Sequence, residues 1–149
     1  MNQFVVYIPV GILLIISSWT DIKRKMISGV VLWIFVFLGI ITNLIFHYNS
    51  ILSVIGGIIP GVITIGISRL TKGEIGLGDG LLLCVTGLYV GFYVNLEMFF
   101  LALFLAAICG IVLLALRKAG RKTELPFVPF LLTAYIIIIV SHVKKICCQ

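Results

Sequence analysis

Long apolar runs alternate with short charged segments along the whole chain. Each run is close to the roughly 20 residues that an α-helix needs to cross the hydrocarbon core of a bilayer. The pattern predicts an all-α integral membrane protein, a polytopic bundle of about six transmembrane helices in a single domain over residues 1–149. The runs are Phe4–Thr20, Val30–Phe46, Ile51–Ser68, Leu81–Leu96, Met98–Leu116 and Phe127–Val143.

The composition supports a membrane protein. The chain is 62% hydrophobic and 11% charged, and its mean hydropathy is +1.29. A soluble domain of this length could not bury so much apolar surface. The first run has no basic segment before it and no clean cleavage site after it, so we read it as a transmembrane helix and not as a removable signal peptide.

The positive charge predicts the orientation in the membrane. The net charge is +6, but the basic residues form no continuous face, so we expect no nucleic-acid binding. They concentrate in the loops after the first, third and fifth runs. We therefore expect a protein of the cytoplasmic membrane, with these loops in the cytoplasm and both chain termini on the outer side. These loops hold Lys23, Arg24, Lys25, Arg69, Lys72, Arg117, Lys118, Arg121 and Lys122, against Lys144 and Lys145 on the other side.

Small residues recur at helical spacing in the third and fourth runs, where they would let helix backbones approach closely. They are Gly57 and Gly61 in the third run, and Gly80, Cys84, Gly87 and Gly91 in the fourth. We expect this packing to hold the fourth helix against the first.

The four cysteines form no metal-binding pattern. No Cys-x-x-Cys is present, so the sequence predicts no zinc site and no other metal or cofactor. Cys84 and Cys109 lie in apolar runs, where we expect them to act as small packing residues. Cys147 and Cys148 are adjacent near the end of the chain, where both a solvated tail and a lipidated tail remain open.

Two of the five acidic residues, Asp21 and Asp79, stand at the ends of predicted spans. A carboxylate at the edge of the hydrocarbon is costly, which makes each a candidate for function. Two predicted spans separate them, so both return to the cytoplasmic face. Each also has a structural explanation: Asp21 could be a cap or an orienting charge beside Lys23, and Asp79 a carboxylate at a helix N-terminus.

Two facing carboxyl groups have a chemistry of their own. Like charges held a few ångströms apart do not both ionise easily, so we expect the pair to share a proton. The ionised partner can take a proton from water and the protonated partner can donate to a carbonyl, as in aspartic proteases. His47 and His142 are predicted on the outer side, away from the aspartates, and Gly76 and Gly78 admit close backbone approach.

Three patches resemble the type IV prepilin peptidase family, membrane aspartic proteases also called leader peptidases. The resemblance extends over essentially the whole chain and implies a single peptidase domain. The patches are Asp21-Ile22-Lys23 with Ile27, Gly76-Leu77-Gly78-Asp79, and Pro126-Phe127-Val128-Pro129-Phe130-Leu131. The second has the form Gly-x-Gly-Asp.

The resemblance implies that Asp21 and Asp79 are the catalytic pair. It implies cleavage of the short basic leader of prepilins or pseudopilins at the cytoplasmic membrane border, in type IV pilus assembly or protein secretion. The supporting motif residues would be Gly76, Gly78, Lys23, Pro126, Phe127, Pro129 and Phe130. Glu74 is read as a solvated loop charge.

The chain departs from the family pattern at two positions. Ser28 stands where a proline is common, and Leu81 stands where a lysine is usual. The cysteine-bound zinc insert of longer members is absent between the first two spans, which implies peptidase activity without N-methyltransferase activity. Two alternatives stay open: an intramembrane protease of the presenilin type, and a non-catalytic scaffold or small transporter with the same fold.

Overall fold

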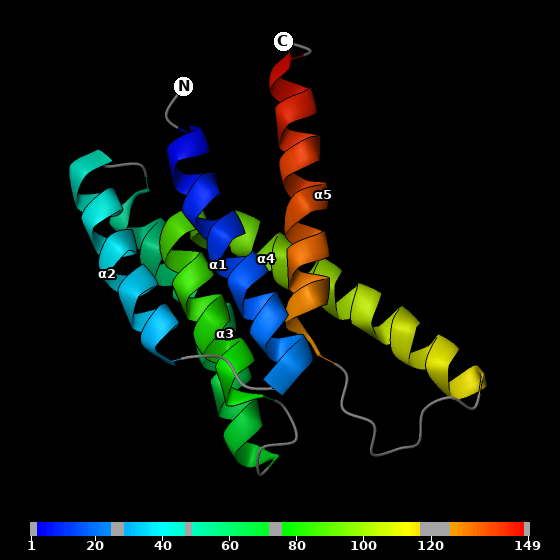
Figure 1. Ribbon diagram of the computed structural model, residues 1–149. Helices are drawn as coiled ribbons and strands as arrows, with labels where there is room; N and C mark the ends of the chain where they lie inside the picture. The colour runs from blue at the N-terminus through cyan, green and yellow to red at the C-terminus, as the bar shows by residue number, and fades with distance from the viewer. Residues whose placement is uncertain (1–2, 25–28, 47–48, 72–75, 117–125, 148–149) are drawn as a thin grey trace.

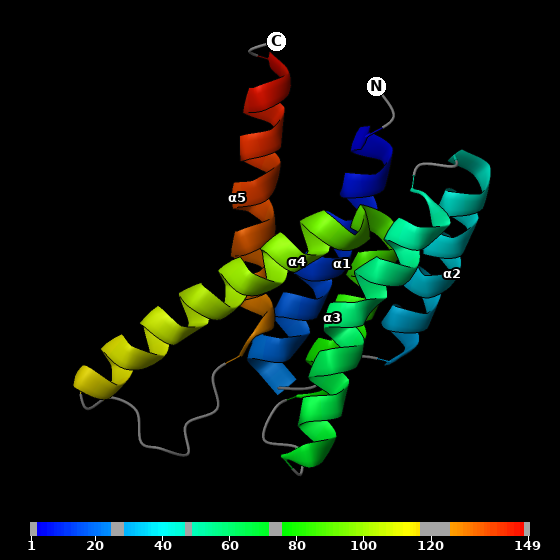
Figure 2. The ribbon, with the colours of Figure 1, turned by 180° about the vertical axis from the view of Figure 1, so that it is seen from behind.

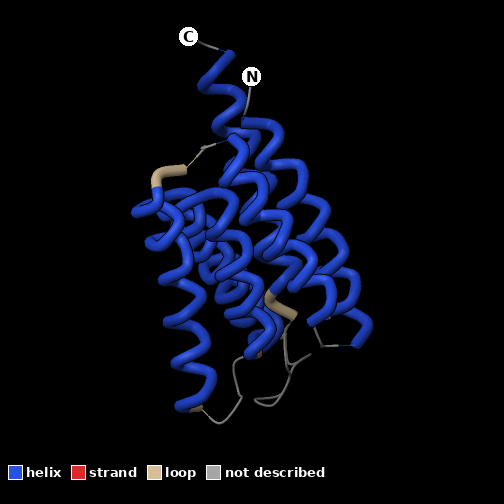
Figure 3. Tube along the Cα trace, turned by 90° about the vertical axis from the view of Figure 1, so that its left-hand side faces the viewer, coloured by secondary structure: helices blue, strands red, loops and turns tan. Residues whose placement is uncertain are grey.

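The structure is a computed structural model that describes residues 3–24, 29–46, 49–71, 76–116 and 126–147 (Figure 1). The regular structure in these ranges is entirely α-helical, as Figure 3 shows. This confirms the predicted all-α class. The helices are α1 (Gln3–Arg24), α2 (Gly29–Phe46), α3 (Ile51–Leu70), α4 (Leu77–Ala115) and α5 (Val128–Cys147).

The helices have the length and the surface of membrane spans. Three of them contain apolar stretches long enough to cross a bilayer, at Val6–Lys23, Ile51–Leu70 and Leu77–Ala115. The two others contain the shorter apolar segments Gly29–Ile45 and Val128–His142. Large apolar side chains are exposed on the outside of the bundle, as a lipid-facing surface requires. The predicted all-α membrane bundle is therefore confirmed.

The fourth helix differs from the prediction. The sequence predicts two spans that meet at Glu97, whereas the structure has one 39-residue helix, α4, that breaks at Gly91. Gly91 has φ 76° and ψ −174°, a backbone conformation that residues with a side chain rarely adopt. Before the break α4 runs along α3, and after it α4 slopes away from the bundle (Figures 1 and 2). Glu97 does not separate two helices as predicted, because it lies within the second half of α4.

Side chains from outside α4 satisfy the carbonyl groups that the break leaves free. The amide Nδ2 of Asn43, on α2, donates to the carbonyl oxygen of Leu88 at 2.6 Å. The amide Nδ2 of Asn49, just before α3, donates to the carbonyl oxygen of Tyr89 at 2.7 Å. The two asparagines therefore supply donors for carbonyl groups that lose their helical partners at the break.

A buried polar cluster joins the two halves of α4. Asn95, in the second half, has no exposed surface. Its Nδ2 donates to the carbonyl oxygens of Gly57 at 2.7 Å and Leu83 at 3.0 Å. Its Oδ1 accepts from the hydroxyl of Thr86 at 2.8 Å. Asn95 therefore connects the second half of α4 to the first half and to α3.

The glycine stripes bring α4 against α3, not against α1 as the sequence predicts. A Cβ atom added at Gly57 would collide with the carbonyl group of Gly87, and one added at Gly61 would collide with Cys84. The stripes of the third and fourth runs therefore face each other at backbone contact. The contact of α4 with α1 is much smaller, because the small residues of α4 point toward α3.

The described helix ends gather on two sides of the bundle. The C-terminal ends of α1 and α3, both ends of α4 and the N-terminal ends of α2 and α5 lie on one side, at the bottom of Figure 1. Both chain termini lie at the top. Most of the basic residues that predict the orientation lie outside the described residues or have side chains that are not described.

Candidate active site

Asp21 lies within α1, one turn from its end, because the helix continues beyond the predicted boundary at Thr20 to Arg24. Its side chain is only 8% exposed. It is the last member of a buried stripe on α1 that also holds Leu13, Leu14 and Ser17. The same stripe that fixes α1 in the core therefore carries a carboxyl group to one end of the bundle.

The carboxyl group of Asp21 caps the last helix of the chain. The backbone N–H of Val128 donates to Oδ2 of Asp21 at 3.2 Å. Val128 is the first residue of α5 and has no exposed surface. The first N–H groups of a helix have no partner within it and carry partial positive charge, so a carboxylate is a favourable acceptor there.

The proline-rich patch is the structure that begins α5. The carbonyl oxygen of Phe127 accepts the N–H groups of Phe130 at 3.0 Å and Leu131 at 3.1 Å, which closes the first turn. Pro129 has no N–H, so one fewer donor needs a partner there. Pro126, Phe127, Pro129 and Phe130 are all half-buried. This patch therefore fixes the position of the Val128 N–H that meets Asp21.

Asp79 lies in the first turn of α4, which begins at Leu77 and so earlier than predicted. Its backbone N–H donates to the carbonyl oxygen of Gly76 at 3.1 Å. A Cβ atom added at Gly76 would lie 2.8 Å from Oδ2 of Asp79, so the carboxyl group folds back over that glycine. Gly76 therefore leaves the space that the carboxyl group occupies, and the half-buried Gly78 lies between the two.

The two aspartates lie close enough for the charge of Asp21 to act on Asp79. They come from α1 and α4, whose ends meet on the side of the bundle where α5 begins. The side chain of Lys23 points elsewhere: it is exposed, and its Nζ lies 4.5 Å from the centroid of the Trp19 ring. The described contact of Lys23 is therefore with an aromatic ring of its own helix.

The structure describes only one of the two positions that depart from the family pattern. Leu81 is 48% exposed, two residues after Asp79, so an apolar side chain occupies the surface where a lysine is usual. Ser28 lies outside the described residues, as do Ile27 and Glu74.

Cys84 is in the α3–α4 contact, with its Sγ 3.8 Å from the carbonyl oxygen of Ile58. Among the residues that the structure describes, no three His, Cys, Asp or Glu side chains are grouped so as to hold a metal ion. Cys148 and the side chain of Cys147 lie outside the described part.

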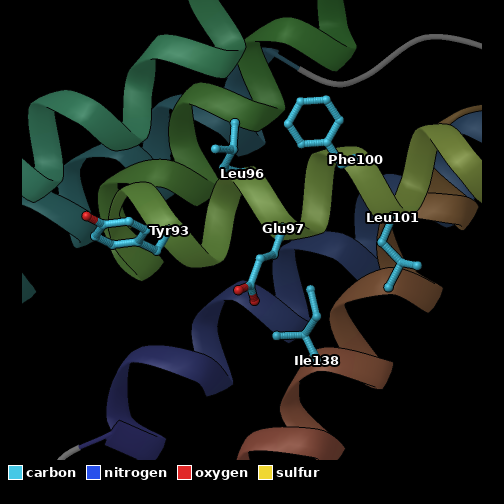
Figure 4. Close-up of a pocket in the computed structure, with 6 residues that line it drawn as sticks. All are labelled: Tyr93, Leu96, Glu97, Phe100, Leu101 and Ile138. Carbon is cyan, nitrogen blue, oxygen red and sulfur yellow. The ribbon is translucent and has the colours of Figure 1, made fainter.

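A separate hollow lies beside the second half of α4 (Figure 4). Its volume is ≈ 680 Å³, and Glu97 points into it toward Ile138 on α5. It contains neither aspartate. Sequence reasoning missed it because it depends on how the second half of α4 lies against α5, which no local pattern reveals. Its other lining residues are Tyr93, Leu96, Phe100 and Leu101.

The fold and the helix ends define the class: an α-helical membrane bundle in which two of the helices, α1 and α4, carry an aspartate near one end. A family model described as the type IV leader peptidase family matches residues 8–113, and the chain belongs to that family. It is therefore a leader-peptidase-like protease. Neither the curated proteins nor the solved structures gave a significant match.

The family match includes both aspartates but ends before α5. The proline-rich patch at residues 126–131 thus lies outside the matched residues. Its link to the rest of the site is the hydrogen bond from Val128 to Asp21.

Proposed function

We propose that this protein is an aspartic leader peptidase in which Asp21 and Asp79 activate water. The observation that carries the proposal is their convergence from α1 and α4 to one end of the bundle, close enough for one charge to act on the other. Two carboxyl groups in this relation supply one base and one acid without a metal or a nucleophilic side chain.

The chemistry is hydrolysis of a peptide bond. The ionised aspartate takes a proton from water, whose oxygen attacks the scissile carbonyl carbon. The protonated aspartate donates its proton to the carbonyl oxygen. Collapse of the tetrahedral intermediate breaks the C–N bond. The carboxyl group that took the proton from water passes it to the leaving amine, and a hydroxyl of the intermediate returns its proton to the other carboxylate, which restores the starting charged and neutral carboxyl groups.

We propose as substrates the short basic leaders of prepilins or pseudopilins, cut at the cytoplasmic border of the cell membrane. In support, Asp21 and Asp79 belong to ends of α1 and α4 that lie on the side where α1, α3 and α4 end, and in the sequence these three ends lead into the most basic segments, which are expected in the cytoplasm. Both chain termini then lie outside. A membrane-border site also suits a substrate whose leader approaches from the cytoplasm.

Only residues 25–28 separate α1 from α2. A connection of that length has no room for a zinc-binding insert with cysteine ligands. We therefore propose peptidase activity without N-methyltransferase activity.

The proposal is tested by co-expressing candidate prepilins with Asp21→Asn and Asp79→Asn variants. Asparagine keeps the shape and removes the acid–base function, so each variant should lose about 10²- to 10⁴-fold in cleavage rate. Glu97→Gln is the matched control, because it removes a carboxylate in the same membrane protein away from the pair. Membrane insertion and thermal unfolding in detergent should match wild type for all three variants.

Two outcomes would contradict the proposal. Wild-type cleavage by either Asn variant would remove that aspartate from the catalytic pair. Failure of the wild-type protein to cleave any leader, with pilin binding that depends on the aspartates, would indicate a non-catalytic scaffold.

A further inference from the structure

The hydrogen bonding of the aspartate pair is asymmetric. Asp21 accepts a backbone N–H from another helix, at 3.2 Å from Val128. Asp79 lies in the first turn of α4. The hydrogen bond that Asp79 makes there is donated by its backbone N–H to the carbonyl oxygen of Gly76 and does not involve its carboxyl group. Asp79 at the start of α4 and Asp21 against the start of α5 both lie where a helix dipole favours negative charge, whereas the last turn of α1, which holds Asp21, opposes it. A direct N–H donor to the carboxylate favours charge more strongly than a first-turn position alone.

We infer that the backbone N–H of Val128 makes Asp21 the charged member of the pair, so that Asp21 is the base and Asp79 the acid. Val128 is then a positioning residue that acts through Asp21. The inference rests on the proposed peptidase function and assigns the roles within it. Because a backbone N–H can only donate, it matches the ionised carboxylate, which only accepts.

Burial stabilises the hydrogen bond between Val128 and Asp21. Val128 has no exposed surface and Asp21 is 8% exposed, so little water competes for the hydrogen bond. Pro129 contributes no N–H, which leaves Val128 as the donor that the beginning of α5 presents to the carboxyl group. A second link, from the hydroxyl of Tyr135 to the carbonyl oxygen of Tyr7, holds α5 against α1 farther along.

Among the side chains that the structure describes, the charged and titratable groups near Asp21 do not reverse the asymmetry. The helices that pack on α1 are α2, α4 and α5. The sequence of α2 contains no titratable residue, and the first titratable residue of α5 is Tyr135, engaged with Tyr7. From α4, Asp79 is the group whose charge interacts with that of Asp21. On α1 itself, Lys23 lies over Trp19.

Val128→Pro removes this single N–H while keeping a helix start. Proline is favoured at the first position of a helix, where its fixed φ suits the turn. Val128→Ala is the matched control, because it loses similar side-chain packing and keeps the N–H. The measurement is the pH dependence of kcat/KM for cleavage of a purified prepilin in detergent, with thermal unfolding as the check on folding.

The N–H favours the charged form, so its loss lets the base be protonated at higher pH. We expect the acid limb for Val128→Pro to move upward by about one pH unit relative to Val128→Ala, which is about a tenfold loss at a fixed pH on that limb. Near the plateau the two variants should converge. A uniform loss at every pH, or no difference between them, would overturn the inference.

A second measurement uses the wild-type protein and does not depend on how the proline variant folds. The carboxyl ¹³C signals of the aspartates, assigned with Asp21→Asn and Asp79→Asn, are followed in a pH titration. Asp21 should keep the signal of the ionised form to lower pH than Asp79, and the opposite order would overturn the role assignment. If wild type cleaves leaders but the order is reversed, only this inference fails; if it cleaves none, the peptidase proposal fails instead.

Discussion

A single methyl group at Gly76 should reduce catalysis without destabilising the protein. In Gly76→Ala the new Cβ would lie 2.8 Å from Oδ2 and 3.4 Å from Cγ of Asp79. Favourable contacts lie near 3.5–4.0 Å, so the carboxyl group must move by roughly 1 Å. Since this is the end of a flexible side chain, the movement itself costs little.

The backbone accepts the substitution. Gly76 has φ −60° and ψ 119°, which alanine adopts without strain. Loss of glycine flexibility in the unfolded chain should even stabilise the fold by about 0.4–1 kcal/mol. A displacement of about 1 Å at a reacting group can cost about 10²-fold in rate, so we expect kcat/KM to fall about 10- to 100-fold.

The assay is cleavage of a purified prepilin, with thermal unfolding in the same detergent. Gly66→Ala, on α3, is the control, because a Cβ there meets nothing within 4 Å. It should leave cleavage unchanged. A Gly76→Ala variant with wild-type kcat/KM would show that the carboxyl group of Asp79 does not lie over Gly76 in the active enzyme, and the argument from this contact would fall.

Three further predictions follow from the same structure. Asn95→Leu removes three hydrogen bonds, each worth about 0.6 kcal/mol in membrane proteins. It should therefore lower the free energy of unfolding in detergent by about 2 kcal/mol. An unchanged free energy of unfolding would contradict a structural role for the buried cluster. Gly87→Ala, whose Cβ meets the backbone of Gly57, should destabilise by about 1–3 kcal/mol, whereas Gly66→Ala should not; equal stability would contradict the close α3–α4 contact. Prepilin cleavage should persist after treatment with a metal chelator, and a loss restored by added metal would refute catalysis by carboxyl groups alone.

Most helices follow from the sequence because apolar length decides them. The predicted runs at residues 30–46 and 51–68 match α2 (Gly29–Phe46) and α3 (Ile51–Leu70) within two residues. The break in α4 could not be placed in this way. It depends on amide groups of Asn43 and Asn49 that reach carbonyl groups 45 and 40 positions away, which no local pattern reveals.

The candidate site was predictable in part. The side shared by Asp21 and Asp79 follows from counting the spans between them, and the resemblance supplies their roles. The donor to Asp21 could not be predicted, because Val128 is 107 positions away and uses a backbone group. Likewise, the glycine stripes predict a close helix contact but do not identify α3 as the partner, since a stripe shows only that a helix can be approached.

The hydrogen bond between Asp21 and Val128 has a consequence for biosynthesis, because it joins α1 to α5, which are about 100 residues apart in the sequence. Ribosomes add about 5–20 residues per second, so α5 follows α1 by roughly 5 to 20 seconds. Until α5 is inserted, the carboxyl group of Asp21 lacks this partner and α1 lacks its largest helix contact. A nascent chain that ends before residue 126 should therefore be inserted but inactive, so the enzyme would become a protease only after α5 has been made.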